Sequence, residues 1–401
     1  MRVDNLQKYI SDGKAVISAD IEFSSYARPR TIFFAYPEKY YDCLPDSADP
    51  FFAAVLMPAM IGGQPLEVGG GLSARIMKNQ AVIQDIFSVW YPERFSKIKV
   101  LAAEATPQAF MAEPGNATFF SLGVDSMYTM LKYLPQNRPD PDKQLTSLVY
   151  MKGLELPLSH YAAGQDQEVI RSVQRVAAHY NLEVIAGETN IRDVFSLSWE
   201  DYYAGPGLAA SALSLSGGFK HFFIPSTHSY AVFFLLPSSP LTDHLWSNEL
   251  MEISHDGSEK ERVGKIADMI VQDDFALQNL RVCVSNNGGD YNCGKCWKCI
   301  RTMISLEILG RLETSGCFPE KLPRNFSAEL RTYDPISLEF NRENLKLATL
   351  LGNKNLKEKL EREIRLGSLD VYRNGKPMAG FLKEILSYLY LKMVKRTGLA
   401  D

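Results

Sequence analysis

The sequence predicts an α/β protein, namely a doubly wound parallel sheet with a small α/β module before it and a helical extension after it. From residue 117 onward, short segments rich in β-branched and aromatic residues alternate with segments whose apolar residues recur at helical spacing. This alternation is typical of a parallel sheet that helices cover on both faces. The chain has 401 residues, 46% of them hydrophobic, which exceeds the usual size of one core and predicts more than one domain.

Residues 1–103 are expected to form the N-terminal α/β module. Three of its segments are predicted strands because they are rich in β-branched and aromatic residues: 15–23, 30–36 and 97–103. Ser73 is a suitable cap for a helix whose isoleucines recur at helical spacing until Pro92. Residues 104–116 contain two prolines, a glycine and little periodicity, so we predict that they are a linker.

Residues 117–312 are expected to form the sheet domain. Its predicted strands are 117–120, 145–151, 183–186, 221–225 and 280–284, and its predicted helices are 124–134, 166–180 and 208–215. Pro135 and the pair Gly217-Gly218 are stop signals after the first and third of these helices. A parallel sheet with helical crossovers follows from this order.

Residues 313–401 are expected to be a helical C-terminal extension. The segment 341–366 is rich in charge, and a final helix has an apolar stripe that runs from Leu382 to Met393. Basic residues accompany this stripe, so it suits a partner or a membrane surface, but docking onto the core is the favoured interpretation.

Charge and cysteine content limit the class of protein. Forty-three basic and 47 acidic side chains give a formal charge of −4, which offers no general attraction to nucleic acid or to an anionic membrane. The N-terminus lacks the apolar core of a signal peptide, and the apolar runs 51–57 and 230–236 are too short to span a bilayer. Four of the six cysteines lie within seventeen positions, which suits metal binding in a reducing compartment. We therefore expect a cytoplasmic protein.

A candidate phosphate loop, Ser121–Ser126, lies between the first predicted strand and helix of the sheet domain. It consists of Ser121, Leu122, Gly123, Val124, Asp125 and Ser126. The unpaired amides at a helix N-terminus, the helix dipole and the two serine hydroxyls all favour an anion. Asp125 repels phosphate, so it is expected to orient the loop or to help hold magnesium. The alternative is an ordinary turn in which Asp125 and Ser126 only cap the helix.

The same six residues resemble the loop of the PP-loop ATP pyrophosphatases, which reads Ser-Gly-Gly-X-Asp-Ser after the first strand of such a sheet. Five of the six positions agree when the free position is counted. Leu122 replaces the first glycine of that pattern, which indicates either a narrowed site or a degenerate one. The resemblance implies a HUP-type sheet and the binding of ATP with Mg²⁺.

Four cysteines form a second motif, with the spacing Cys-X9-Cys-X2-Cys-X2-Cys. They are Cys283, Cys293, Cys296 and Cys299. Four thiolates so close in sequence can surround one tetrahedral ion, and a glycine-rich turn at 286–290 can bring the first cysteine to the other three. We predict a structural Zn²⁺ site that does no chemistry, because protein ligands fill all four positions. An iron–sulfur cluster is the alternative.

The order of the loop and the cysteine cluster resembles that of 7-cyano-7-deazaguanine synthase-like proteins, which carry a Cys-Gly-X-Cys-X-X-Cys core late in the sheet domain. The similarity covers about residues 117–312 and depends on the pair of motifs. Residues 1–103 and 313–401 have no counterpart in that resemblance. A relative of the synthase with a different substrate is therefore expected.

Further candidate site residues follow from the layout that the resemblance implies. Adenine would lie between the ends of the first two strands, beside Phe120, Met151 and Lys152, although Phe120 and Met151 suit a core equally well. His255, Arg262 and Lys265 form a dense polar cluster before the cysteines. Two cations three positions apart on a helix can bind phosphates or a carboxylate, and a histidine can move protons. The alternative is a solvated helix start, capped by Asp256 or Ser258.

We expect an enzyme that adenylates a carboxylate or carbonyl oxygen, releases pyrophosphate, and lets ammonia or an amine displace AMP. Asp125, His255, Arg262 and Lys265 are the candidate catalytic residues, and ATP, Mg²⁺ and Zn²⁺ the expected cofactors. A small carboxylate or base-like molecule is the expected substrate, while a protein substrate and a homodimer remain open. One alternative is sulfur transfer through Cys43 or Cys317, and another is a non-catalytic nucleotide-binding or assembly protein with a degenerate loop.

Overall fold

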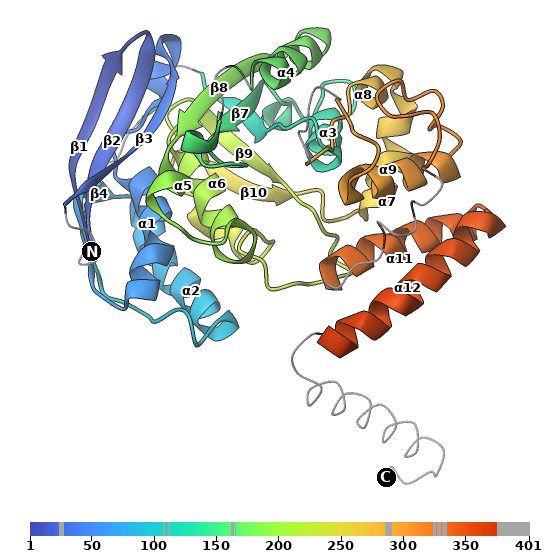
Figure 1. Cartoon of the computed structure of the whole chain (residues 1–401). Helices are drawn as coiled ribbons and strands as arrows, with labels where there is room; N and C mark the ends of the chain where they lie inside the picture. Colours follow the sequence, from blue (N-terminus) through green and yellow to red (C-terminus); the bar gives the residue numbers. More distant parts are fainter. Residues whose placement is uncertain are drawn as a thin grey trace, which may run out of the picture. The chain divides into compact units, whose positions relative to one another are not determined.

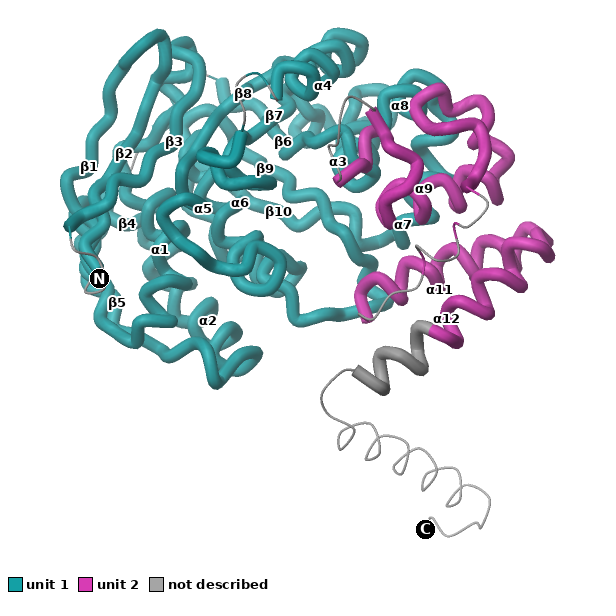
Figure 2. Tube along the Cα trace, in the orientation of Figure 1, with its two compact units in different colours: residues 1–280 teal, residues 281–401 magenta. Residues whose placement is uncertain are grey.

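The computed structural model divides into two compact units, Met1–Leu280 and Arg281–Asp401 (Figure 2). The structure describes residues 1–23, 28–106, 109–110, 113–161, 164, 166–284, 291–323, 326, 330 and 335–374. Each unit is described by itself. In these residues, no helix combines the length and the apolar character that crossing a bilayer requires.

One ten-stranded sheet organises the first unit (Figure 1). Its strand order is β10-β9-β6-β7-β8-β3-β2-β1-β4-β5. The strands are β1 (Arg2–Ser11), β2 (Lys14–Glu22), β3 (Arg30–Pro37), β4 (Leu66–Leu72), β5 (Val100–Glu104), β6 (Gly115–Phe119), β7 (Ser147–Lys152), β8 (Glu183–Thr189), β9 (Phe219–Pro225) and β10 (Glu252–Asp256). All neighbours among β6 to β10 are parallel, as are the pairs β1–β4 and β4–β5. The predicted α/β architecture with a mostly parallel sheet is confirmed.

The N-terminal strands continue the same sheet. β1, β2 and β3 pair antiparallel, and left-handed backbone at Asp12 and Gly13 makes the tight turn between the first two. β3 then pairs antiparallel with β8, where Phe34 lies opposite Thr189. The division of the chain at residues 104–116 and 312 stays a prediction, and residues 107, 108, 111 and 112 of the predicted linker lie outside the described residues.

Helices flank the sheet (Figure 1). The larger helices of this unit are α1 (Asp49–Gly62), α2 (Ala74–Trp90), α3 (Val124–Lys132), α4 (Gln167–His179) and α6 (Ala204–Leu213). The shorter ones are η1 (Glu38–Cys43), η2 (Pro141–Lys143), η3 (Leu158–His160), α5 (Ile191–Val194), η4 (Trp199–Tyr203), η5 (Asp243–Trp246), α7 (Arg262–Asp268), η6 (Ile270–Gln272) and α8 (Asp274–Gln278). The Ser73 hydroxyl accepts the amide of Ile76, so the predicted cap of α2 is confirmed.

α1 supplies much of the core. It contains the apolar run 51–57, and its residues from Asp49 to Met60 are all buried. α1 packs against α6, whose glycines, alanines and serines let the two backbones approach closely. The small residues of α6 therefore have a packing role.

One predicted strand is wrong. Residues 280–284 form no strand, and the fifth strand of the parallel set is β10, whose His255 was predicted as part of a polar cluster. β10 is an edge strand with one neighbour, β9, and it buries His255 and Asp256 against polar partners. Apolar alternation is therefore missing from β10. Leu280, Val282 and Cys283 are buried without belonging to the sheet, which explains why their segment resembles a strand.

The second unit contains α9 (Trp297–Ile308), α11 (Pro335–Leu350) and α12 (Lys354–Asn374). α9 and α11 are joined by Asn344, which accepts a hydrogen bond from Ser305 and donates one to the carbonyl of Arg301. The charge-rich segment 341–366 lies in the two helices α11 and α12, which are separated at Gly352, where the backbone is left-handed. The predicted apolar helix from Leu382 to Met393 lies outside the described residues.

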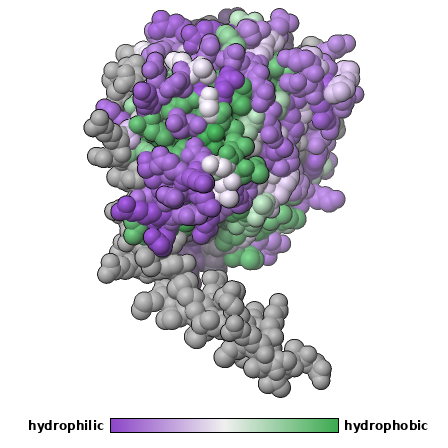
Figure 3. Space-filling view, turned by 90° about the vertical axis from the view of Figure 1, so that its right-hand side faces the viewer, coloured by the Kyte–Doolittle hydropathy of each residue, from purple (hydrophilic) through white to green (hydrophobic). Residues whose placement is uncertain are grey.

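On the face drawn in Figure 3, hydrophobic patches lie between hydrophilic ones.

Candidate functional site

The carboxyl ends of β6 and β9 define the candidate site. Numbered along the chain, the parallel strands β6 to β10 have the order 3-2-1-4-5, so the direction of winding reverses between β6 and β9. In open α/β sheets, ligands bind outside the carboxyl ends of the strands at such a reversal. The loop that follows β6 is Ser121–Ser126, and the loop that follows β9 begins at Ser226. The fold therefore places the predicted phosphate loop at the position where a ligand is expected.

Side-chain hydroxyls fix the shape of the phosphate loop. The Ser126 hydroxyl donates to the carbonyl of Gly123 at 3.1 Å and accepts from the amide of Ser121 at 3.3 Å. The Ser121 hydroxyl accepts from the amide of Gly123 at 3.4 Å. Gly123 is the N-cap residue of α3 and has no side chain to cap the helix. Asp125 and Ser126 do not cap α3 from outside, because both lie within it.

Leu122 adopts a backbone conformation that favours glycine. Its φ is 65°, which is uncommon for a residue with a side chain, and its side chain is fully buried. This is the position at which the PP-loop pattern has a glycine. The loop keeps the shape that a glycine would adopt easily, and burial of the leucine side chain offsets the strain of that shape.

Two buried cations contact Asp125 in the loop. Nη1 of Arg262 lies 2.5 Å from Asp125 Oδ2, and Nζ of Lys265 lies 3.3 Å from Asp125 Oδ1. The side chains of Arg262 and Lys265 are 9% and 0% exposed, although both residues lie in the short helix α7. The structure therefore joins three of the four predicted catalytic residues in one cluster. The alternative of a solvated helix start does not hold for these two cations.

Lys265 also contacts the loop after β9. Its ammonium donates to the carbonyl of Ser226 at 2.6 Å and to the Ser226 hydroxyl at 3.0 Å. Gly257, which follows β10, has a φ of 95°, and a Cβ atom there would lie 3.3 Å from Nζ of Lys265. No role was predicted for Ser226, since a serine at a strand end carries no signal that a distant lysine will bind it.

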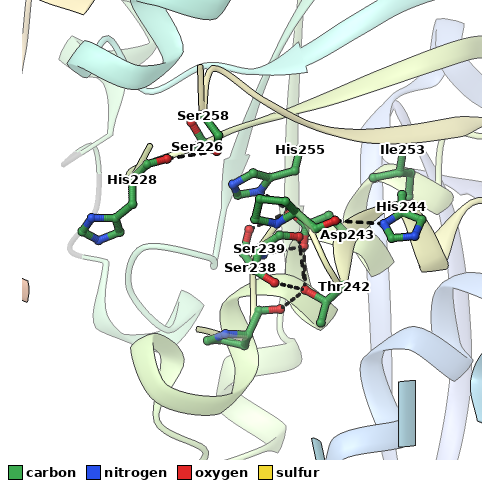
Figure 4. A network of polar contacts seen from close by, with 12 residues as sticks. Ser226, His228, Ser238, Ser239, Thr242, Asp243, His244, Ile253, His255 and Ser258 are labelled. Carbon is green, nitrogen blue, oxygen red and sulfur yellow. Dashed lines mark hydrogen bonds and ion pairs between the residues drawn. The ribbon is translucent and has the colours of Figure 1, made fainter. Parts of the chain in front are cut away.

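His255, the fourth predicted catalytic residue, belongs to a different network (Figure 4). Its Nδ1 lies 2.8 Å from Oδ2 of Asp243, a fully buried carboxylate that also accepts a hydrogen bond from Ser238. His255 and Asp256 are successive strand residues, so they point to opposite faces of the sheet. His255 has no contact with Asp125, Arg262 or Lys265 among the hydrogen bonds and ion pairs of the described residues. Asp243 was not predicted, because twelve residues separate it from its histidine.

Asp256 binds α3 to the end of β10. It accepts hydrogen bonds from Thr129, Lys132 and Tyr133, at 2.7, 2.7 and 2.9 Å. Burial lowers the pKa of Lys132, but Asp256 and Glu259 outweigh this effect, and the net pKa lies above its ordinary value. The helix that begins in the phosphate loop is therefore anchored to β10 by charge. Asp256 does not act as the helix cap that the sequence allowed.

The residues predicted to contact adenine lie beside this loop but are largely enclosed by protein. Phe120 is 2% exposed and Met151 is 6% exposed, and the amide of Phe120 donates to the carbonyl of Val149. Lys152 is half-buried, and its ammonium lies 3.3 Å from Asp166. The adenine contacts stay a prediction, and burial of Phe120 and Met151 equally suits a role in the core.

A long apolar loop follows Ser226. In it Tyr230, Phe233 and Leu235 are 67%, 54% and 44% exposed, although six of the seven residues from 230 to 236 are large and apolar. Phe233 packs edge-on against Trp90 of α2, with ring centroids 6.1 Å apart. This apolar run is therefore an irregular surface segment of the first unit rather than a buried strand.

The four cysteines of the second unit come together as predicted. The Sγ atoms of Cys283, Cys293, Cys296 and Cys299 all lie within 4.8 Å of one another. Two of the pairs are 3.9 and 4.0 Å apart. A tetrahedral zinc ion with Zn–S bonds of about 2.3 Å would separate its sulfurs by about 3.8 Å. The cluster can therefore bind one metal ion such as zinc. The predicted glycine-rich turn at 286–290 lies outside the described residues.

The backbone around the cysteines also suits a metal. The amides of Lys295 and Cys296 donate to the sulfur of Cys293, at 3.4 and 3.3 Å. Gly294 has a φ of 64°, and a Cβ atom there would lie 2.5 Å from Pro319. A hydrogen bond from Cys299 lowers the pKa of Cys296 to about 4, and the same bond raises the pKa of Cys299. Thiolate is thus favoured at Cys296 and disfavoured at Cys299, and thiolate is the form that binds metal.

Comparisons with protein-family models, with curated proteins and with solved structures find no match to this chain.

Proposed function

We propose that this protein is an ATP-dependent adenylating enzyme of the PP-loop type, with a HUP-type sheet and a structural zinc site. One observation carries the proposal. The loop Ser121–Ser126 lies at the reversal point of the parallel sheet, and its acidic residue is held by two buried cations. Two cations against one carboxylate leave this loop with a net positive charge, which an ordinary helix turn does not need and a polyphosphate site does.

The strand order supports this proposal. The order 3-2-1-4-5 of β6 to β10 is the order expected of nucleotide-binding sheets whose first strand leads into the phosphate loop. The five agreeing positions of Ser121–Ser126 and the downstream cysteine cluster then add to it, because both motifs occur in 7-cyano-7-deazaguanine synthase-like proteins.

The loop amides and the serine hydroxyls would bind the β- and γ-phosphates, and Arg262 would neutralise their charge. Asp125 fits a loop-orienting role better than a magnesium-binding one, because each of its oxygens already faces a cation. Mg²⁺ would supply charge neutralisation as it arrives with the phosphates of ATP.

The proposed reaction has two steps. A carboxylate or carbonyl oxygen of the substrate attacks the α-phosphorus, and the bond to pyrophosphate breaks. Ammonia or an amine then attacks the activated carbon, the carbon–oxygen bond to AMP breaks, and AMP leaves with that electron pair. The chain's own contribution is to position the phosphates and to stabilise negative charge at them.

Zinc is the proposed metal of the cysteine cluster. In a four-iron cluster each cysteine binds a different iron, so the cysteine sulfurs lie farther apart than sulfurs that bind one ion. The short sulfur–sulfur distances here therefore favour a single ion. Because four protein sulfurs would fill a tetrahedral ion, its role would be to stabilise the second unit.

Calorimetry with ATP and Mg²⁺ tests the nucleotide site directly. We expect the wild type to bind, Asp125→Ala to bind more weakly, and Asp46→Ala to bind like the wild type, because Asp46 is 75% exposed and forms only a long ion pair with Lys8. Turnover with the right substrate should give AMP and pyrophosphate. Formation of ADP and phosphate would contradict the proposed reaction, and a wild type that binds no ATP would favour a non-catalytic protein.

Sulfur transfer through Cys43 gains no support from the structure. Cys43 contacts Gly217 and Gly218, which precede β9 and so lie at the amino ends of the strands, opposite the phosphate loop. Burial, Glu183 and Asp42 raise the pKa of the Cys43 thiol, which disfavours a nucleophilic thiolate. The adenylating reaction followed by amine attack is therefore the function that the geometry supports best.

A further inference from the structure

We infer that Lys265 is a positioning residue, which acts by binding Ser226 and Asp125 together and so fixes the phosphate loop, rather than by contacting phosphate itself. This inference rests on the proposed function, and it replaces the direct phosphate or carboxylate contact first expected for Lys265. It also assigns a role to Ser226 and Gly257.

The contacts of the ammonium group support this role. A lysine ammonium has three hydrogen-bond donors. Those of Lys265 face the Ser226 carbonyl at 2.6 Å, the Ser226 hydroxyl at 3.0 Å and Asp125 Oδ1 at 3.3 Å. All three donors are therefore used within the protein. A direct bond to phosphate would require one of these contacts to break.

The location of these contacts explains why they matter. Asp125 lies in the first turn of α3, which follows β6, while Ser226 lies directly after β9 and Gly257 directly after β10. β6 and β9 are the two strands between which the winding of the sheet reverses. One buried charge from α7 thus connects loops on both sides of the proposed phosphate position. A charge at this place sets the relative position of the two loops.

Gly257 gives Lys265 the space it needs. A Cβ atom at residue 257 would lie 3.3 Å from Nζ of Lys265 and 3.2 Å from the Ser226 hydroxyl, and the φ of 95° already disfavours a side chain. The variant Gly257→Ala therefore moves the ammonium without removing its charge. This separates the effect of position from the effect of charge.

Gly257→Ala and the removal of the lysine charge in Lys265→Met each have a matched control. Gly264→Ala adds a Cβ on α7 that makes only an ordinary contact of 3.6 Å with Lys260. Lys8→Met removes a partly buried lysine of β1, which contacts the carbonyl of Leu44 and Asp46 and, among the described residues, has no contact with the phosphate loop. Lys265→Met is the main variant, and Ser226→Ala is a milder one that removes a single acceptor in case Lys265→Met does not fold.

Hydrogen exchange of the nucleotide-free protein gives the first measurement. We expect Lys265→Met and Gly257→Ala to increase amide exchange in residues 121–126 and 226–230, with a smaller increase in Ser226→Ala. The two control variants should leave both segments unchanged. Folded Lys265 and Gly257 variants with wild-type exchange in residues 121–126 would overturn the inference. This measurement does not need ATP, so it decides the inference even when the wild type binds none and the proposed function fails.

Calorimetry with ATP and Mg²⁺ gives the second measurement. Loss of one charge-assisted contact typically weakens binding by roughly ten- to a hundredfold. We expect losses of this order in both Lys265→Met and Gly257→Ala, because both disturb the loop. If Gly257→Ala binds ATP as the wild type does while Lys265→Met does not, the charge of Lys265 acts on phosphate directly and the inference is wrong.

Discussion

Replacing Leu122 by glycine and by alanine tests whether the phosphate loop is strained. Leu122 has a φ of 65° and a fully buried side chain. Either replacement removes that side chain and should lower the free energy of unfolding by about 2–5 kcal/mol. The informative quantity is the difference between the two variants, since only alanine retains the cost of left-handed backbone.

The same two replacements at Leu131, which is buried within α3, provide the reference for the difference in unfolding free energy between alanine and glycine. In a helix interior, alanine is more stable than glycine by about 1 kcal/mol. At Leu122 the same preference is opposed by a left-handed cost to alanine of roughly 1–2 kcal/mol. Glycine at residue 122 should therefore be as stable as alanine or up to about 1 kcal/mol more stable.

Urea unfolding measures this difference. The chain has four tryptophans, and Trp297 is the one in the second unit, so a Trp297→Phe background leaves three that report on the first unit. At each position we compare the free energy of unfolding of the alanine variant with that of the glycine variant. We expect the advantage of alanine over glycine to be smaller at residue 122 than at residue 131, by about 1–2 kcal/mol. If the alanine variant is more stable than the glycine variant by the same free energy at both positions, the loop is not strained and the prediction is wrong.

Two further predictions concern the metal and pH. Wild-type protein should contain one zinc per chain by elemental analysis, and Cys296→Ser should lose it and unfold the second unit at lower temperature; equal zinc in both would contradict the cluster. Burial raises the pKa of Glu259, but Lys132 and other donors outweigh it, and the net pKa lies below the ordinary 4.5. The Glu259 carboxylate should therefore stabilise the fold fully at pH values above 4.5, and this stabilisation should be lost as the pH falls through the lowered pKa. Glu259→Gln should therefore flatten the acid limb of a stability–pH curve, and an unchanged limb would contradict this.

Local patterns predicted those parts of the fold in which local and tertiary preferences agree. The helix capped by Ser73 and the strands β2 and β3 follow from cap chemistry and β-branched residues. α1 was not predicted as a helix, since a helix buried on all sides has no polar face and its sequence lacks helical periodicity. β1 was missed for the opposite reason, because most of its side chains are not buried and it has few apolar residues.

The error at residues 280–284 has a related cause. Burial of Leu280 and Val282 does not arise from the sheet, whereas the true fifth strand, β10, buries polar residues. A sequence pattern records which side chains avoid water, but it does not record which neighbours enclose them. Asp256 has three hydrogen-bond donors as partners, so its burial left no apolar signal.

The candidate site could be predicted in its residue types but not in its connections. The spacing of Arg262 and Lys265 placed both cations on one helix, and the loop motif singled out Asp125. Nothing local indicates that these residues, 137 and 140 positions apart in the chain, meet. Their meeting depends on β10, which carries the chain back to the carboxyl end of the sheet directly before α7.

This dependence connects the fold to the strain at Leu122. A loop held only by local preference would have glycine at a φ of 65°, because glycine adopts it without strain. The leucine is tolerated since contacts from outside the loop determine its shape: Asp125 is held by α7, and α3 is anchored to β10 through Asp256. Weakening those contacts should therefore disturb a leucine-containing loop more than a glycine-containing one. Combining Leu122→Gly with Lys265→Met should reduce the extra amide exchange in residues 121–126, and an additive increase would contradict this coupling.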